Sequence, residues 1–267
     1  MKNLRSFAII WISKTYASLF SRGIFAKINY FILMLALQAR GYNNFKNNNE
    51  SGESFFIKYV LAPTNPKLCI DIGANIGAYT SELLENTKAN VISFEPLPTA
   101  FESLIQTTND YIERITLENK GVGKSVESLT IHFNPNALAR ASFSEDIKKV
   151  SYVSNEQKLI VPVVTLDSYC DEKKIKEIDL IKIDTEGFEA EVFEGAKKTF
   201  TIIKPKFIQI EFNWHQMFRN TSLNFFAEKL PDYDVYQLIP NGWVKRDPKD
   251  PLVNIYHFSN FVFVRKT

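Results

Sequence analysis

Short apolar runs recur through the middle of the chain and alternate with segments of helical periodicity. The runs occupy residues 68–72, 91–95, 115–118, 178–184 and 207–212. After the first run, Ile76, Tyr79 and Leu83 follow one another at the spacing of a helix face. Strands that alternate with helices in this way predict a Rossmann-like α/β fold, whose open and mostly parallel sheet has helices on both faces.

Two pairs of further strands are expected outside this series. β-branched residues and alternation predict strands over 128–133 and 159–164, and the polar segment 134–155 between them reads as an irregular insertion that could line an acceptor pocket. Apolar runs at 235–239 and 260–264 predict an antiparallel hairpin that closes the sheet. The Pro- and Asp-rich residues 240–251 are expected to form the loop of that hairpin.

The first fifty residues differ from the rest, so we divide the chain into an N-terminal helical extension, 1–50, and one α/β domain, 51–267. The longest apolar run of the extension, 31–37, is too short to span a bilayer. A signal peptide is disfavoured because Ser13-Lys14-Thr15 interrupts the apolar stretch. We expect one or two helices that pack on the domain, and contact with a membrane surface through residues 1–40 is the alternative.

Composition narrows the class of protein. Hydrophobic residues make up 45% of the 267 and charged residues 23%, as in an ordinary globular chain. The net charge of +2 gives no reason to expect a nucleic-acid partner. Cys69 and Cys170 lack the spacing of metal ligands, so we expect reduced thiols in a cytoplasmic protein. Nothing in the sequence indicates an oligomeric state.

A glycine turn follows the first strand and predicts a nucleotide-type site. Gly73 and Gly77 flank Asn75, and glycine lets a ligand approach the backbone closely. Glu95 ends the next strand 18 residues after Gly77, which is about the offset at which an acidic residue meets the two hydroxyls of a ribose. Asp71 lies two residues before Gly73, where it would repel a pyrophosphate but attract an ammonium or sulfonium group.

These features favour S-adenosylmethionine over a dinucleotide, because the third glycine of the dinucleotide fingerprint is missing. Val122, between Gly121 and Gly123, could touch the adenine, although a simple hairpin turn would explain the same glycines. The alternative for Asp71 and Glu95 is that they cap loops.

Acidic residues end four of the expected parallel strands, at the edge where open α/β sheets bind ligands. They are Asp71, Glu95, Asp184 and Glu211. Glu186 and His215 follow two of these strand ends. In contrast, Glu189, Glu191 and Glu194 fall in the first turns of a helix and are expected to be mostly solvated surface.

Six segments can be compared with known families: Asp71-Ile-Gly-Ala-Asn-Ile-Gly, Phe94-Glu-Pro, Thr165-Leu-Asp, Lys182-Ile-Asp-Thr-Glu-Gly-Phe-Glu, Gly195-Ala and Ile210-Glu211. Together they resemble the FkbM methyltransferases, and the resemblance covers about residues 51–267. It implies a class I methyltransferase fold and methyl transfer from S-adenosylmethionine to a hydroxyl oxygen, often of a sugar, a glycan or a natural product. It also implies that Asp71, Gly73, Asn75, Gly77 and Glu95 bind the cofactor, with Asp184 and Glu186 beside the methyl donor and acceptor.

Methyl transfer to a hydroxyl calls for a base, and four residues are candidates: Asp184, Glu186, Glu211 and His215. We favour His215 or Asp184, and a structural histidine is the alternative for His215. A second hypothesis is that Asp184, Glu186 and Glu211 bind Mg²⁺, which would lower the pKa of the acceptor hydroxyl. The competing function classes are a nicotinamide-dependent oxidoreductase and a non-catalytic binding protein. The acceptor itself, a small molecule or glycan with a free hydroxyl, is not identified.

Overall fold

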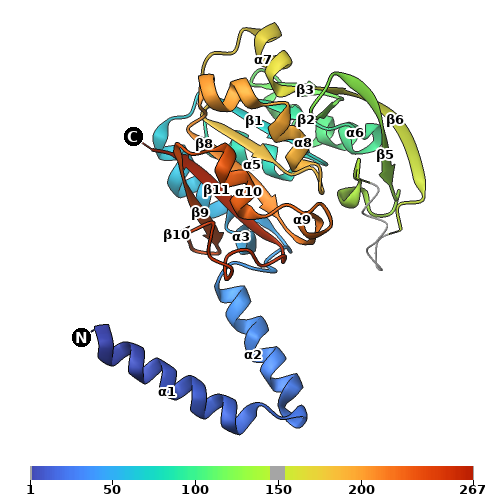
Figure 1. Cartoon of the computed structure of the whole chain (residues 1–267). Helices are drawn as coiled ribbons and strands as arrows, with labels where there is room; N and C mark the ends of the chain where they lie inside the picture. The colour runs from blue at the N-terminus through green and yellow to red at the C-terminus, as the bar shows by residue number, and fades with distance from the viewer. Residues whose placement is uncertain (1, 145–153, 267) are drawn as a thin grey trace.

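The computed structural model describes residues 2–144 and 154–266, and its centre is an eight-stranded sheet (Figure 1). The strand order is β10-β9-β11-β8-β7-β1-β2-β3. The bounds of the strands are Leu68–Ile72 (β1), Asn90–Phe94 (β2), Ile115–Glu118 (β3), Leu180–Ile183 (β7), Phe207–Phe212 (β8), Tyr233–Ile239 (β9), Gly242–Arg246 (β10) and Ser259–Arg265 (β11).

The sheet has a parallel half and an antiparallel half. β8, β7, β1, β2 and β3 pair in parallel, in that spatial order. β11 is antiparallel to both β8 and β9, which confirms the predicted closing hairpin. The prediction that 240–251 is only a loop is wrong, because β10 lies within it and pairs with β9. Its Lys245 and Arg246 suit an edge strand that faces solvent on one side.

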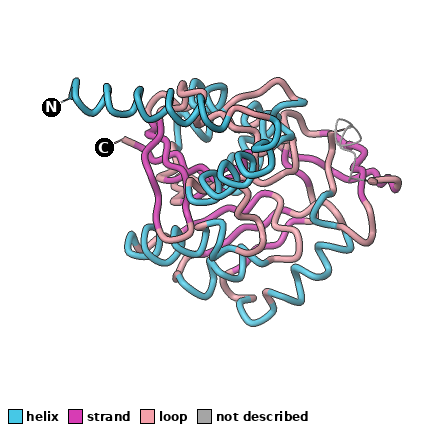
Figure 2. The backbone as a smooth tube through the Cα atoms, turned by 90° about the horizontal axis from the view of Figure 1, so that it is seen from below, coloured by secondary structure: helices cyan, strands magenta, loops and turns pink. Residues whose placement is uncertain are grey.

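Helices cover both faces of the sheet, as the alternating pattern predicted (Figure 2). Ile70 and Ile72 of β1 face one apolar core, and Cys69, the residue before Ile70, faces the other. The helices are Asn48–Ser51 (α3), Glu53–Phe55 (α4), Ala78–Asn86 (α5), Pro98–Thr107 (α6), Leu166–Lys173 (α7), Glu189–Glu194 (α8), Trp214–Phe218 (α9) and Leu223–Lys229 (α10), with π-helical turns at Phe56–Leu61 and Thr199–Ile203. The sheet is therefore buried from both sides, which leaves its strand ends as the place for ligands.

A second, three-stranded sheet lies beside the main one and has the order β4-β6-β5. It consists of Gly121–Val122 (β4), Glu127–Phe133 (β5) and Gln157–Val164 (β6), and β5 and β6 are the strands predicted by alternation. A small apolar core of Leu97, Ala100, Ile131 and Val161 joins this sheet to α6. Of the predicted insertion 134–155, residues 145–153 lie outside the described residues.

The two N-terminal helices, Lys2–Phe20 (α1) and Ala26–Ala39 (α2), stand away from the rest of the molecule (Figure 1). In α2 only Leu37 is buried, and the large apolar residues of both helices that are described are mostly exposed. The prediction that these helices pack on the domain is therefore wrong. It assumed that apolar side chains find cover within the same chain, whereas only the last turn of α2 reaches it.

Candidate active site

A cleft of about 1,040 Å³ opens over the carboxyl ends of β1, β2, β7 and β8. Its floor is made of the predicted strand-end residues Gly73, Asn75, Glu95, Asp184, Glu186 and Glu211. Backbone and side chains from four separate strands thus meet in one place. This is where an open α/β sheet with these connections binds its ligand.

The glycine turn after β1 is packed against the end of β7. Gly73 has φ +86°, and a Cβ built there would lie 1.8 Å from the carbonyl oxygen of Asp184. Only glycine fits this position, for both steric and conformational reasons. Gly77 also has a positive φ, but it packs on Leu104 of α6 and lies outside the residues that line the cleft. Gly77 therefore shapes the start of α5 rather than the floor of the cleft.

Glu95 is held rigidly in the floor of the cleft. One carboxylate oxygen accepts a hydrogen bond from the backbone N–H of Asn75 at 2.8 Å, and the other accepts from the N–H of Leu97 at 2.8 Å. Burial raises the pKa of Glu95 to about 7, although these two hydrogen bonds oppose the shift. A carboxylate oxygen can accept more than one hydrogen bond, so both oxygens remain able to receive hydroxyls from a ligand.

Asp71 lies one layer below the glycine turn. It is fully buried and does not line the cleft, and its carboxylate accepts a hydrogen bond from the Thr80 hydroxyl at 2.7 Å. Burial raises the pKa of Asp71, and the neighbouring Lys182 opposes the shift. Of these predicted cofactor-binding residues, Gly73, Asn75 and Glu95 line the cleft, and Asp71 lies beneath them.

Lys182 is a charged residue that the sequence interpretation did not single out, and it anchors this floor. Its side chain is 5% exposed, and its ammonium lies 2.8 Å from a carboxylate oxygen of Asp184. Burial lowers the pKa of Lys182, but the nearby carboxylates of Asp184, Asp71 and Glu53 outweigh that effect and the pKa is raised. The one available signal was a lysine in the middle of an otherwise apolar strand, Leu180–Ile183.

Glu53 belongs to the same buried network as Lys182. Its carboxylate accepts hydrogen bonds from the amide of Gln209 at 2.8 Å and from the hydroxyl of Ser51 at 2.7 Å. The other amide atom of Gln209, its oxygen, accepts from the Tyr79 hydroxyl at 2.7 Å. Every one of these groups is buried, so the network fixes the relative positions of α4, α5 and β8 beneath the cleft.

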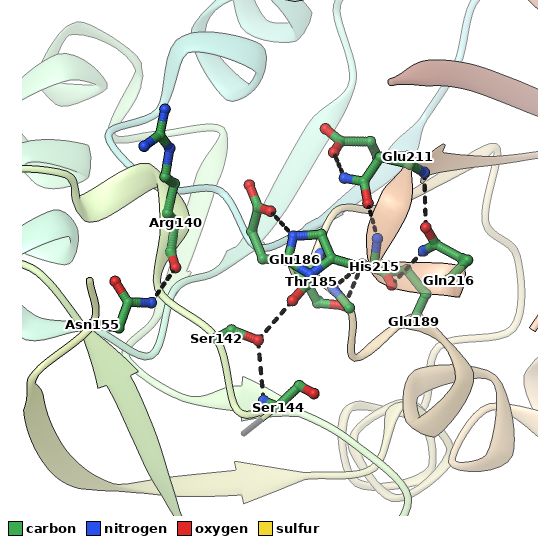
Figure 3. Close-up of polar contacts among 12 residues, drawn as sticks. Arg140, Ser142, Ser144, Asn155, Thr185, Glu186, Glu189, Glu211, His215 and Gln216 are labelled. Carbon is green, nitrogen blue, oxygen red and sulfur yellow. Dashed lines mark hydrogen bonds and ion pairs between the residues drawn. The ribbon is translucent and has the colours of Figure 1, made fainter. Parts of the chain in front are cut away.

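Glu186 and His215 form a pair at the edge of the cleft where β7 and β8 end (Figure 3). The imidazole Nε2 of His215 lies 2.8 Å from a carboxylate oxygen of Glu186. Glu186 lines the cleft, whereas His215 is 3% exposed and lies behind it. A ligand in the cleft therefore meets the glutamate first, and the histidine supports it.

The loop that carries Glu186 is fixed by hydrogen bonds from below. Glu186 itself has φ +51°, an uncommon conformation for a residue other than glycine. A carboxylate oxygen of Glu189 accepts hydrogen bonds from the N–H groups of Thr185 at 2.9 Å and Gly187 at 3.1 Å. Its second oxygen accepts from the Gln216 amide at 2.9 Å. The prediction of a solvated helix surface is therefore wrong for Glu189, which is 2% exposed.

Helix α9 positions His215 through a capping box. The Asn213 side chain accepts a hydrogen bond from the backbone N–H of His215 at 2.8 Å, and the Gln216 side chain accepts from the N–H of Asn213 at 2.7 Å. Such caps stabilise a helix start by about 1 kcal/mol. The imidazole packs on Gly187, where a Cβ would lie 3.0 Å from its Nδ1. The Glu186–His215 pair is thus held from two elements at once.

Asp184, Glu186 and Glu211 bring carboxylate oxygens within 4.8 Å of one another. Each already has a protein partner: Lys182 for Asp184, His215 for Glu186 and the Asn213 amide for Glu211. Burial, together with the charges of Asp184 and Glu186, raises the pKa of Glu211 well above its usual range. The free oxygens of the three side chains could hold a divalent cation, since such ions take carboxylate ligands.

The side of the cleft away from the main sheet is formed by the second sheet and by the insertion that follows β5. Val122, Phe143 and the segment 138–141 line it, and Trp214 faces it from α9. Arg140 lies in this wall, where its backbone carbonyl accepts a 2.6 Å hydrogen bond from the Asn155 amide (Figure 3). Val122 and Arg140 therefore both line the cleft on this side.

Comparison with known proteins matches the chain to methyltransferases. The model of the family described as "Methyltransferase FkbM domain" matches residues 71–235. AglP of Haloferax volcanii, a hexuronic acid methyltransferase, is 31% identical over 125 residues, which cover 47% of this chain and 48% of that protein. NoeI of Sinorhizobium fredii, a 2-O-methyltransferase, is 27% identical over 192 residues, or 65% of this chain and 74% of that protein.

The match to AglP thus spans about half the length of that relative. Among solved structures, an rRNA methylase of Streptococcus thermophilus is similar at 13% sequence identity and a TM-score of 0.46. The similarity covers 80% of this chain and 94% of the methylase. A similarity of this size says nothing about the substrate.

Proposed function

The chain belongs to the FkbM methyltransferase family, and on that premise we propose that it transfers a methyl group from S-adenosylmethionine to a hydroxyl oxygen of a sugar, a glycan or a related natural product. The observation that carries the proposal is that one cleft holds both a rigid carboxylate, Glu95, and the Glu186–His215 pair. The names of the two curated relatives, which refer to a hexuronic acid and to 2-O-methylation, support a sugar hydroxyl as the acceptor.

The cofactor half of the cleft fits an adenosyl ligand. Glu95 presents a carboxylate that backbone N–H groups already orient, and the ribose hydroxyls would donate to it. Gly73 and Asn75 allow close approach of the ligand to the backbone, and Val122 lines the wall where a base would lie. When bound, S-adenosylmethionine would supply the methyl group on a sulfonium, from which it leaves in an in-line displacement. Rigid placement of both reactants lowers the barrier of such a step.

Glu186 is the base that the geometry favours, with His215 as the residue that positions it. The acceptor hydroxyl would give its proton to Glu186 as its oxygen bonds to the methyl carbon, and S-adenosylhomocysteine would leave with the electron pair of the broken bond. Burial raises the pKa of Glu186, opposed by His215, and a raised pKa makes a carboxylate a stronger base. Asp184 is less available to accept the proton, because its carboxylate is already engaged in an ion pair with the Lys182 ammonium.

Glu211 is the less favoured acceptor of that proton, because one of its carboxylate oxygens already accepts a hydrogen bond from the Asn213 amide. Burial and the charges of Asp184 and Glu186 raise the pKa of Glu211 well above its usual range. Our second hypothesis is that a divalent cation held by Asp184, Glu186 and Glu211 lowers the pKa of the acceptor hydroxyl. Activity that falls in a chelator and returns with Mg²⁺ would support that hypothesis, and indifference to the chelator would exclude it.

The proposed function is tested first by ligand-dependent thermal stability. S-adenosylhomocysteine at about 100 times its dissociation constant should stabilise the protein by about 2.7 kcal/mol, and NAD should not. The shift should vanish in Glu95→Ala and persist in Glu102→Ala, which removes an exposed carboxylate of α6. A shift with NAD alone would replace the proposal by a nicotinamide enzyme. Binding of S-adenosylhomocysteine without methyl transfer to any of a panel of sugars would indicate a non-catalytic binding protein.

The pKa of Glu95 predicts that cofactor affinity depends on pH. Ribose hydroxyls donate to the ionised carboxylate, and its pKa is about 7 in the free protein, so binding weakens as pH falls through that value. The dissociation constant of S-adenosylhomocysteine should be about tenfold higher at pH 6 than at pH 8. Calorimetric titration at both pH values measures this. Glu95→Gln should bind weakly with little pH dependence, and equal affinities of the unmodified protein at pH 6 and pH 8 would contradict the assignment.

A further inference from the structure

Helices α1 and α2 expose apolar side chains on every side. Between residues 8 and 36 no residue is buried. Ile24 is 81% exposed, Tyr30 65%, Ile9 64% and Trp11 63%. Helices of a water-soluble domain bury one apolar stripe and expose polar residues opposite, whereas helices that are apolar all round need an apolar environment all round.

The two helices form a bent pair, with a turn of 104° between 8–20 and 23–39. No single helix in the described part of the chain is long and apolar enough to cross a membrane, although the bent pair passes that test when taken together. At 1.5 Å per residue, α2 is about 21 Å long, which is less than the roughly 30 Å of a hydrocarbon core. The geometry fits a hairpin that enters one side of a bilayer and turns back.

The charge of residues 1–49 also favours the surface of a lipid bilayer. Residues 1–49 contain seven basic residues and no acidic one: Lys2, Arg5, Lys14, Arg22, Lys27, Arg40 and Lys46. Residues 50–267 have the opposite balance, with 25 Lys and Arg against 30 Asp and Glu. A positively charged apolar segment is complementary to a surface of anionic lipid.

We propose that α1 and α2 dock the protein on a lipid bilayer that contains anionic headgroups. A second copy of the chain fits less well, because it would bring two groups of like charge together and would cover only one side of each helix. A bilayer covers all sides of both helices and neutralises the charge. Trp11, Tyr16 and Tyr30 are residue types that favour the boundary between headgroups and acyl chains.

The residues that follow the C-terminal end of α2 are fixed to the body of the protein. Docking of the helices would therefore also orient the cleft. The Tyr42 hydroxyl donates to the carbonyl of Val253 at 3.0 Å, and the N–H of Asn43 donates to the carbonyl of Phe258 at 2.8 Å. Asn43, Phe45 and Lys46 line the cleft. Fewer than five residues therefore separate the end of α2 from the cleft wall, and docking would hold the cleft close to the bilayer surface.

Flotation of the full-length chain with vesicles tests the proposal. The protein should float with phosphatidylcholine vesicles that contain about 30% phosphatidylglycerol, and bind at least about tenfold less to phosphatidylcholine alone. Ile28→Ser with Phe31→Ser and Leu33→Ser should abolish flotation on both. Lys14→Gln with Arg22→Gln and Lys27→Gln should remove the preference for anionic vesicles. Ile112→Ser with Ile202→Ser is the matched control, since both side chains are 74% exposed on the body, and it should float normally.

Two results would overturn the proposal. One is a failure of the unmodified protein to float with either vesicle. The other is a vesicle-free dimer, measured by light scattering, that the Ile28, Phe31 and Leu33 substitutions convert to monomer, which would identify a second copy as the partner. S-adenosylhomocysteine binding, measured on each variant, confirms that the body is folded. Since flotation requires neither cofactor nor turnover, its outcome is independent of the proposed methyl transfer.

Discussion

Glu186→Gln should lower kcat by about 100- to 10,000-fold, which is the range that a positioned general base contributes. Glutamine keeps the size of the side chain and can still accept a hydrogen bond from His215, but it cannot take up the proton of the acceptor hydroxyl. The affinity for S-adenosylhomocysteine should change little, because Glu95 and the glycine turn lie across the cleft floor. Single-turnover methyl transfer from labelled S-adenosylmethionine measures the chemical step.

Glu194→Gln is the matched control for this substitution. Glu194 ends α8 and pairs with Lys197 and Lys229 away from the cleft, so its loss should leave kcat within about twofold, as surface changes generally do. A retained kcat in Glu186→Gln would contradict the assignment of Glu186 as the base. The pH profile adds an independent readout: kcat should fall on the acid side as Glu186 becomes protonated, and Glu186→Gln should lose that limb.

Activity in the presence of a chelator distinguishes the two hypotheses for Asp184, Glu186 and Glu211, a general base without a metal or a bound cation. If Glu186 acts as the base alone, a chelator leaves the rate unchanged, and Glu211→Gln has a smaller effect than Glu186→Gln. If the three acids hold a cation, Asp184→Asn, Glu186→Gln and Glu211→Gln should all impair activity, and excess Mg²⁺ should partly restore each.

The sequence predicted the sheet well because apolar periodicity is a local signal. The runs at 68–72, 115–118 and 207–212 became strands with the expected bounds. Glu95, Asp184 and Glu211 lie together at one edge of the sheet because parallel strands point the same way. The strand Gly242–Arg246 was missed because its alternation is weak and its neighbours are Pro and Asp, which are typical of turns.

The sequence could not predict how deeply each charged side chain is buried. Asp71 and Glu95 both end strands, yet the structure places only Glu95 in the cleft and buries Asp71 under the turn. Glu189 has the spacing of a surface helix residue, but it accepts hydrogen bonds from a loop that periodicity does not describe. Burial of a charge depends on partners distant in sequence, such as Gln216 for Glu189, and no local pattern encodes them.

Lys182→Met should destabilise the protein by about 3–5 kcal/mol, the usual cost of breaking a buried ion pair from one side. Methionine fills a similar volume, so the loss comes from charge: Asp184 loses its 2.8 Å ion pair, and the buried carboxyl groups of Asp71 and Glu53 lose a nearby cation. Urea unfolding should show a lower midpoint at an unchanged m-value. Lys245→Met, which breaks an exposed pair with Asp234 on the edge strand, should cost about 1 kcal/mol or less.

The pH dependence of this loss of stability shows whether Lys182→Met acts through the lost charge or through a packing defect. Burial already raises the pKa of Asp71 and of Glu53, and Lys182 lowers both, so its removal should raise them further. Protonation of these carboxyl groups relieves the unpaired charge, and the instability of Lys182→Met relative to the unmodified protein should therefore shrink between about pH 7 and pH 5. A packing defect would cost the same at both pH values. A loss below about 1 kcal/mol at pH 7 would show that the carboxyl groups around Lys182 are already neutral, and that the floor of the cleft is held by hydrogen bonds rather than by charge.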